Sequence, residues 1–152
     1  MTMNTYKRHA AGSMMMMCMF LAMATTSCRQ EVNEGDEVDD MVERCWDYAQ
    51  KNPDGFTIDI RSFEAPSQGI VVSYAATQNS FDKKDLHKVV MHALSHANLV
   101  GGWLNEANHR YYFDSDTLFD ESMLNEALKW GKENGQQSVF ILSEMKNVDI
   151  EY

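Results

Sequence analysis

The sequence predicts an α+β domain, in which an antiparallel sheet of about five strands carries helices on one face. Apolar residues recur at helical spacing in residues 38–51, 82–97 and 121–134. Short segments between these helices are alternating or continuously apolar, as half-buried and buried strands are. Glycine, proline, asparagine and aspartate separate the segments, which is typical of turns.

The first predicted helix, residues 38–51, ends at Asn52-Pro53-Asp54-Gly55, a strong stop and turn signal. Residues 56–61 then alternate apolar and polar, which predicts a half-buried strand. A loop with Pro66 and Gly69 leads to a second strand at residues 70–75. We expect these two strands to form a hairpin with a long connection.

The second predicted helix, residues 82–97, has Asp82 as its expected cap and an apolar face that includes Leu86 and Val90. A third strand is expected at residues 99–104, where Gly101 and Gly102 indicate a bulge or the close approach of another group. A turn over residues 105–110 leads to a fourth strand that begins at residues 111–115.

The third predicted helix, residues 121–134, follows a capping Asp120, and residues 138–142 and 148–152 predict a fifth and a short sixth strand. The chain therefore reads as two ββα units preceded by an N-terminal helix. Phe81-Asp82 and Phe119-Asp120 begin similar patterns, which favours either an internal duplication or convergence on a common helix entry.

The N-terminus predicts export. Lys7 and Arg8 precede an apolar run over residues 14–24, which is too short to span a membrane and is typical of a signal peptide. Cys28 follows small residues and resembles the acylated cysteine of a bacterial lipoprotein, although Thr25 stands where an aliphatic residue is usual. The alternative is cleavage after Ala24, which would release a soluble secreted protein.

These signals divide the chain into a signal peptide (residues 1–27), an acidic tether (28–37) and a single α+β domain (38–152). The expected location is the cell envelope, with the membrane as a partner through the lipid on Cys28. The net charge of −10 argues against nucleic acid as a partner, because nucleic acid is a polyanion, and suits a cationic ligand or a basic protein.

The cysteines and histidines offer little catalytic chemistry. Cys45 lies in an apolar helical pattern and is expected to be a buried free thiol, and no zinc-type cysteine spacing is present. His92 and His96 share a helix face and are weak candidates for a metal site, whereas His87 lies on the other flank. Asp85 is the nearest possible oxygen ligand, and the simpler interpretation is that both histidines are surface residues.

The acidic segment at residues 114–121 places Asp114 and Asp116 on one side of a strand, but no calcium-loop pattern is completed. Asp120 and Glu121 are better explained as stabilising a helix start. No serine lies in a nucleophile-elbow motif, and no phosphate-binding glycine loop is present. No cofactor is expected.

An aromatic and polar group is the strongest candidate for a binding surface: Trp103, Tyr111, Tyr112 and Phe113, with Asn79, Asn105 and Arg110 nearby. Adjacent tyrosines on a strand face opposite sides, so one of the pair is expected in the core and the other on the surface. An exposed aromatic strip on a sheet suits recognition of proteins or sugars, while core packing is the alternative.

Four blocks carry a resemblance: residues 52–57 (NPDGFT), 77–81 (TQNSF), 101–103 (GGW) and 111–115 (YYFDS). Together they resemble an uncharacterised domain of small proteins from Bacteroides-type bacteria and of phages and other mobile elements. The resemblance covers roughly residues 52–143 and implies no catalytic residue. Its polar positions Thr77, Gln78, Asn79 and Asp114 are candidates for ligand or partner binding, although capping turns also explain them.

Three hypotheses follow. The first is an exported, lipid-anchored binding module that is not an enzyme. The second is a small hydrolase or transferase, which requires His92 or His96, Asn79 and Asp114 to converge in one pocket. The third is a mobile-element accessory or immunity-like protein that binds a basic partner through its acidic surface.

Overall fold

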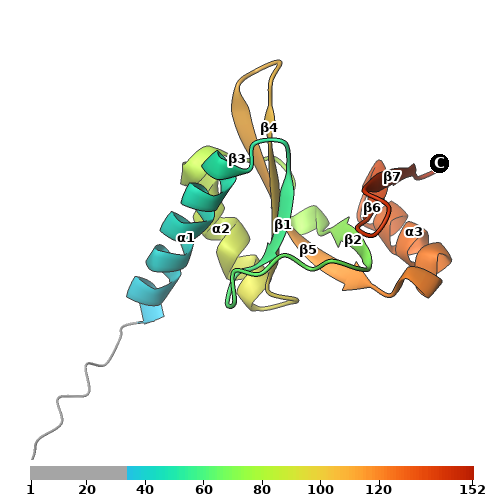
Figure 1. Ribbon diagram of the computed structural model, residues 1–152, viewed down its shortest axis with the longest axis horizontal. Helices are drawn as coiled ribbons and strands as arrows, with labels where there is room; N and C mark the ends of the chain where they lie inside the picture. Colours follow the sequence, from blue (N-terminus) through green and yellow to red (C-terminus); the bar gives the residue numbers. More distant parts are fainter. Residues whose placement is uncertain (1–33) are drawn as a thin grey trace, which may run out of the picture. The chain divides into compact units, whose positions relative to one another are not determined.

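The computed structural model describes residues 34–152, and every structural statement below concerns these residues. They form a seven-stranded antiparallel sheet with the strand order β1-β4-β5-β2-β6-β7, in which β3 pairs with β5 (Figure 1). The helical segments are α1 (Glu34–Lys51), η1 (Ala75–Thr77), α2 (Asp82–Leu94), η2 (Glu121–Met123) and α3 (Leu124–Glu133). The strands are β1 (Phe56–Asp59), β2 (Ile70–Ser73), β3 (Ser80–Phe81), β4 (Leu99–Asn105), β5 (Arg110–Phe119), β6 (Ser138–Ile141) and β7 (Lys146–Asp149).

The predicted α+β class is confirmed, with seven strands in place of about five. β3, with two residues, was not predicted; β7, which forms a hairpin with β6, corresponds to the predicted short sixth strand but lies at Lys146–Asp149 and not at residues 148–152. Helix α1 begins at Glu34, so residues 34–37 of the predicted tether are helical. No helix among the described residues is long and apolar enough to cross a membrane.

Strand β5 is shared by two halves of the sheet. Its first part pairs with β4 over residues 110–116, and its last part pairs with β2 over residues 116–119. Asp116 has partners on both sides, Leu99 in β4 and Ser73 in β2. We call α1, α2, β1, β3, β4 and residues 110–115 the first half, and β2, β6, β7, α3 and residues 117–119 the second half.

Each half has its own hydrophobic cluster. In the first half, α1 and α2 pack against β1, β4 and Phe113, and in the second half α3 packs against β2, β6 and Phe119. Phe113 and Phe119 are six positions apart on β5, and side chains alternate along a strand, so both point to one face. All three helices therefore cover the same face of the sheet. Trp103, Tyr112 and Asp114 belong to the other face, which we call the open face.

The predicted hairpin between the first two strands is wrong. β1 pairs with β4, and β2 pairs with β5 and β6. In the sheet, the β4–β5 hairpin lies between β1 and β2. Residues 60–69, which connect β1 to β2, therefore cross the width of β4 and β5. The hairpin between the third and fourth predicted strands is confirmed.

Asp82 does not cap α2, contrary to the prediction. Its φ is 57°, and its side chain turns toward β5, where Oδ1 accepts a hydrogen bond from the Tyr111 backbone N–H at 3.1 Å. Asp85 instead reaches back to the Phe81 N–H at 2.9 Å. Asp120 does cap its helical segment, because it accepts from the Ser122 N–H at the start of η2.

The adjacent glycines of β4 admit neighbouring side chains, and no bulge interrupts the β4–β5 pairing. A Cβ at Gly102 would lie 2.7 Å from the Phe113 ring and 3.0 Å from the Phe56 ring. On the opposite face, a Cβ at Gly101 would overlap the carboxyl group of Asp116. Close approach, one of the two expectations for these glycines, is therefore confirmed.

Candidate functional site

A row of side chains crosses three strands on the open face: Trp103 in β4, Tyr112 in β5, Phe81 in β3 and Arg110 in β5. We call it the aromatic row. Trp103 and Tyr112 are cross-strand partners whose rings stack at 5.0 Å with an angle of 23°. Phe81 meets Tyr112 edge to face at 4.8 Å, and the Arg110 guanidinium lies 4.2 Å from the Phe81 ring centre.

Hydrogen bonds hold the row in place. Asp82 accepts from Arg110 Nε at 3.1 Å and also from the Tyr111 N–H, so the guanidinium is fixed against Phe81. Asn108, in the β4–β5 turn, donates to the Tyr112 hydroxyl at 2.9 Å. Among the members of the row, Trp103 is the most exposed, at 45%. The row is therefore a fixed aromatic surface with one end available to solvent.

The open end of the row lies beside Gly55. Leu104 N–H donates to the Pro53 carbonyl at 2.8 Å, which holds the turn after α1 against β4. A Cβ placed on Gly55 would lie 3.9 Å from the Trp103 Cβ, so Gly55 is the neighbour of Trp103 on the side away from Tyr112. Because glycine has no side chain, the indole is not covered from that side.

Two carboxyl groups lie further along the open face, at Asp114 and Asp116. Asp116 is only 2% exposed, and it accepts a hydrogen bond from the Ser73 hydroxyl at 2.7 Å. Burial raises the pKa of Asp116 to about 8, and the neighbouring Asp114 adds to the rise. Burial also raises the pKa of Asp114 to about 7, against the opposing charge of Lys88. The pair therefore holds protons near neutral pH.

On the helix-covered face, a polar seam joins the two halves at Tyr74, Thr77, His92 and Ser115. His92 Nδ1 lies 2.9 Å from the Ser115 hydroxyl, and the Ser115 N–H donates to the Thr77 hydroxyl at 2.9 Å. The Tyr74 ring contacts His92 from the first half at 4.9 Å and Trp130 from α3 at 4.9 Å. The seam is thus a set of hydrogen bonds and ring contacts between two hydrophobic clusters.

Two of the predicted polar candidates, Thr77 and Gln78, make hydrogen bonds within the protein that explain them structurally. Thr77 is fully buried in the seam, where its hydroxyl takes the position of a missing strand partner. Gln78 donates to the Asn134 carbonyl at 3.0 Å and so connects η1 to the end of α3. Asn79 is exposed, with a φ of 60°, in the turn before β3. Asp114 lies on the open face, as described above.

The two adjacent tyrosines face opposite sides, as predicted. Tyr111 points to the helix-covered face, where its ring meets Trp46 at 5.2 Å and it packs against the first cluster. Tyr112 points to the open face and belongs to the aromatic row. Of this pair, only Tyr112 contributes to the candidate binding surface.

His92 and His96 do share a face, and their rings stack at 3.9 Å. Both rings also contact Tyr74; His96 is exposed and His92 is half-buried, so the prediction of surface residues holds for His96, whereas His92 is partly packed. Burial lowers the pKa of His92, and the charges of His96 and Lys88 lower it further. Within residues 34–152, no group of three or more possible metal ligands comes together.

The residues that the enzyme hypothesis needs are not brought together. His92 contacts Ser115, whereas Asp114 is the residue before Ser115 on β5 and so points to the opposite face of the sheet. Asn79 lies in an exposed turn. Cys45 is fully buried, and burial raises the pKa of its thiol to about 12, which confirms the predicted buried free thiol.

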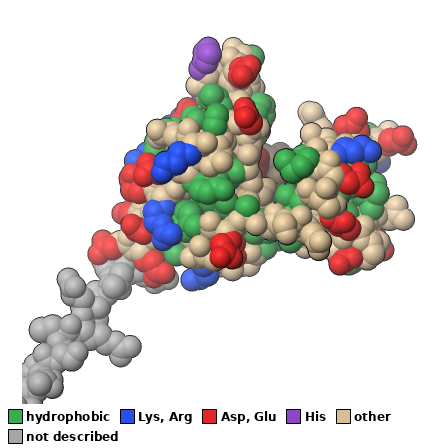
Figure 2. All heavy atoms as spheres, viewed as in Figure 1, with side chains coloured by type: hydrophobic (Ala, Val, Ile, Leu, Met, Phe, Trp, Pro, Cys, Tyr) green, Lys and Arg blue, Asp and Glu red, His purple; other side chains and the backbone are tan. Residues whose placement is uncertain are grey.

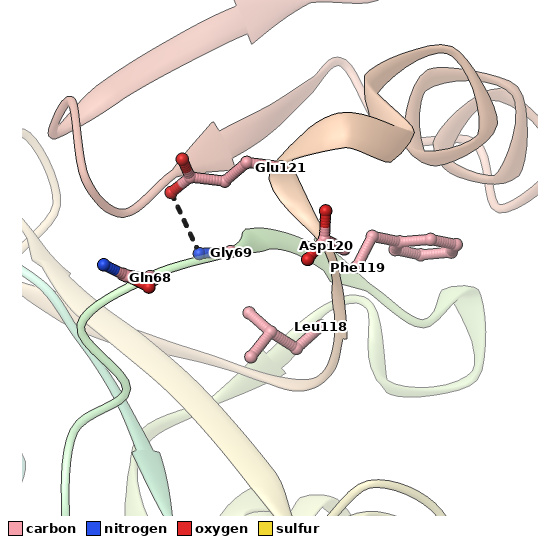
Figure 3. Close-up of a pocket in the computed structure, with 6 residues that line it drawn as sticks. All are labelled: Gln68, Gly69, Leu118, Phe119, Asp120 and Glu121. Atoms are coloured by element: carbon pink, nitrogen blue, oxygen red, sulfur yellow. Dashed lines mark hydrogen bonds between the residues drawn. The ribbon is translucent and has the colours of Figure 1, made fainter.

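Two hollows accompany these features. One, of about 480 Å³, lies between residues 68–69 and residues 118–121, where Glu121 reaches across to the Gly69 N–H at 3.1 Å (Figure 3). Its carboxylate joins η2 to the residue just before β2 and so acts structurally. The other, of about 660 Å³, lies between the start of α1 and α2, and Arg61, His87 and Met91 line part of it.

Comparison with known proteins finds no matching family, no matching curated protein and no matching solved structure. The resemblance to the Bacteroides-type and phage domain therefore stays a prediction. Cys28, the signal peptide and most of the tether lie outside the described residues, so lipid attachment also stays a prediction.

Sequence reasoning identified Trp103 and Tyr112 but missed the rest of the aromatic row. Phe81 joins it through β3, a strand of two residues that has no periodic signal. Arg110 was noted among nearby polar residues without a partner, and its partner Asp82 was assigned to a cap. The alternation Arg110-x-Tyr112-x-Asp114 is the signal that could have placed three of these residues on one face.

Proposed function

We propose that this protein is a binding module of the cell envelope, anchored by lipid on Cys28, and that its ligand-binding surface is the aromatic row. The observation that carries this proposal is the position of Trp103. A large aromatic side chain that is 45% exposed lies at the end of a row whose other members are fixed by neighbours. Exposed, preorganised aromatic rings are typical of recognition surfaces, because they bury much area at little entropic cost.

The geometry favours binding over catalysis. The aromatic row contains rings and a guanidinium that is already paired, and the neighbouring Asn108 is already bonded to the Tyr112 hydroxyl. The carboxyl pair and the histidines lie on opposite faces of β5, so a nucleophile, a base and an orienting group do not meet at one place. A surface of this composition holds a ligand without supplying a reacting group.

Anchoring is tested by intact mass and membrane fractionation of the full chain and its Cys28→Ala variant in a bacterium with a lipoprotein pathway. We expect an acylated mature chain in the membrane fraction and loss of both lipid and membrane association in the variant. A chain that begins at Thr25 without lipid, or an uncut chain, would overturn the anchoring part of the proposal.

Binding is tested with Trp103 as the only indole, in a variant that carries Trp46→Phe and Trp130→Phe. Its fluorescence is followed against defined probes: cellohexaose, chitohexaose, polygalacturonate and a short arginine peptide. A saturable change with at least one probe, lost in the Tyr112→Ala variant, supports the row as a binding surface. If no probe changes the signal while circular dichroism shows a folded protein, the row is not the binding surface.

A matched control is Leu118→Ala. Leu118 is 39% exposed and lies on the same face of β5, but it belongs to the second half and not to the aromatic row. Its removal takes away exposed apolar area of similar kind. We expect it to leave the affinity for any Trp103-dependent probe unchanged.

A further inference from the structure

The two ends of the aromatic row differ in one respect. At the Phe81 end, the row is covered by the Arg110 guanidinium, which lies 4.2 Å from the ring centre and is paired with Asp82. At the Trp103 end, the neighbour is Gly55, which has no side chain to cover the indole. Indole is the aromatic ring that attracts cations most strongly, so the end without a cation carries the better acceptor.

Charge around the open end also favours a cation. Asp54, in the exposed turn that Leu104 holds against β4, directly precedes Gly55. The nearest basic member of the row, Arg110, is already neutralised by Asp82. The chain as a whole has a net charge of −10, and acidic side chains are spread over α1 and over the part that carries α3 and β7 (Figure 2). A basic partner is therefore attracted to the molecule before it meets Trp103.

We propose that the open side of Trp103 is a subsite for an arginine side chain of a basic protein partner, in which the guanidinium lies on the indole beside Gly55. This inference rests on the proposed function, because it names the ligand class of the same surface. The bound guanidinium would repeat the arrangement that Arg110, Phe81 and Asp82 already form within the protein. Guanidinium suits this position better than ammonium, because it is planar and more weakly hydrated.

The probe is a pair of peptides, acetyl-(Gly-Arg)₃-amide and acetyl-(Gly-citrulline)₃-amide. Citrulline has the shape of arginine with a neutral urea group, so the pair isolates charge from shape. The Trp103-only protein is titrated with each at low and at high salt. We expect the arginine peptide to bind about five- to tenfold more tightly than the citrulline peptide, as a desolvated cation–π contact would give. High salt should reduce this preference.

Variants separate the parts of the subsite, with binding to the otherwise wild-type chain followed by calorimetry. Trp103→Ala should lose most of the affinity for the arginine peptide. Trp103→Phe should lose about half of the preference for the arginine peptide over the citrulline peptide, because phenyl is a weaker cation acceptor than indole. Gly55→Ala puts a methyl group beside the indole, but its φ of 133° strains any other residue, so its fold is checked by circular dichroism. Asp54→Asn leaves the turn chemistry similar and should weaken the arginine peptide alone.

The outcomes are distinguishable. Equal binding of the two peptides, or arginine binding that survives Trp103→Ala, overturns the arginine subsite. Binding of only a neutral hexasaccharide through Trp103 also overturns it, but leaves the row as a binding surface. Absence of any Trp103-dependent signal with every probe overturns both proposals. Selective, Trp103-dependent and salt-sensitive binding of the arginine peptide supports the inference.

Discussion

The first half of the sheet packs thirteen buried residues into one cluster between two helices and the sheet, whereas the second half packs six around the single helix α3. In the first half, the aromatic rings of Phe113, Trp46 and Tyr111 lie together, and Phe113 is only 1% exposed. In the second half, Phe119 and Trp130 are only half-buried. The larger core belongs to the half that carries the aromatic row, so the candidate binding surface lies on the half with the larger buried cluster.

This difference predicts where substitutions cost most. Phe113→Ala removes a fully buried ring from the first cluster, and we expect it to lower the free energy of unfolding by about 3–5 kcal/mol. Phe119→Ala should cost clearly less, because Phe119 is half-buried at the edge of the second cluster. Urea unfolding of both variants measures the difference. Equal costs would mean that the two clusters act as one core.

The carboxyl pair at the junction predicts a pH dependence. Because the folded-state pKa values of Asp114 and Asp116, about 7 and about 8, exceed the ordinary value of 3.8, the folded protein binds protons more tightly than the unfolded chain. The resulting stability is fully present below about pH 4 and is lost as pH rises through 7 and 8. We expect the free energy of unfolding to decrease steadily between pH 4.5 and pH 8.5, because the unfolded chain releases both protons well before the folded protein does.

Asp116→Asn isolates this effect. Asparagine keeps an oxygen that can accept from the Ser73 hydroxyl but has no charge to bury. Chemical unfolding at several pH values should therefore show a flatter profile for the variant and greater stability than the wild type at pH 8.5. A variant with the same pH profile as the wild type would assign the dependence to other groups.

The seam predicts a smaller cost. Thr77→Val keeps the volume of the side chain but removes the hydroxyl that accepts from the buried Ser115 N–H. An unpaired buried donor costs about 1–3 kcal/mol, so we expect a loss of about 2 kcal/mol in thermal or urea unfolding. Thr77→Ser keeps the hydroxyl and is the matched control. If both variants lose the same stability, the methyl group and not the hydrogen bond is responsible.

The smallest expected effects compare one glycine from each half. Gly102→Ala places a methyl group against the buried Phe113 ring and the partly buried Phe56 ring, and should cost about 1–2 kcal/mol through overpacking. Gly131→Ala in α3 would meet the end of the Ile150 side chain at 2.7 Å and the buried Val72 and Val139 side chains at 3.2 and 3.3 Å, but it gains helix propensity of about 1 kcal/mol. We therefore expect Gly131→Ala to cost less than Gly102→Ala, because helix propensity offsets part of the crowding. The same unfolding measurement checks both.

Much of the fold was predictable because local sequence patterns determine it. The three helices, the β4–β5 hairpin and the strands β2 and β6 all follow from apolar periodicity and turn residues. The pairing of β1 was not predictable in this way, because its partner β4 lies about 40 residues further along the chain and no local signal connects Ile58 with Val100. β3 was missed because a pair of residues has no period.

The candidate site was predictable only in part. Trp103 and Tyr112 stood out as aromatic residues on expected strands, and alternation placed Tyr111 and Tyr112 on opposite faces. Phe81, Arg110 and Asp82 join the site through side-chain contacts across strands, which depend on register. The burial of Thr77 and Asp116 depends on the way in which the two halves meet at β5, and composition alone does not reveal it.

Cys45 gives the protein an internal chemical reporter. Its sulfur is enclosed in the first cluster, and a thiol with a pKa of about 12 has almost no thiolate at neutral pH. A water-soluble thiol reagent can therefore reach it only in molecules whose first half has opened. With Cys28 acylated or replaced, the rate at which Cys45 is labelled would report how often the first half opens. Opening of the second half alone would not expose Cys45 and would leave this rate unchanged.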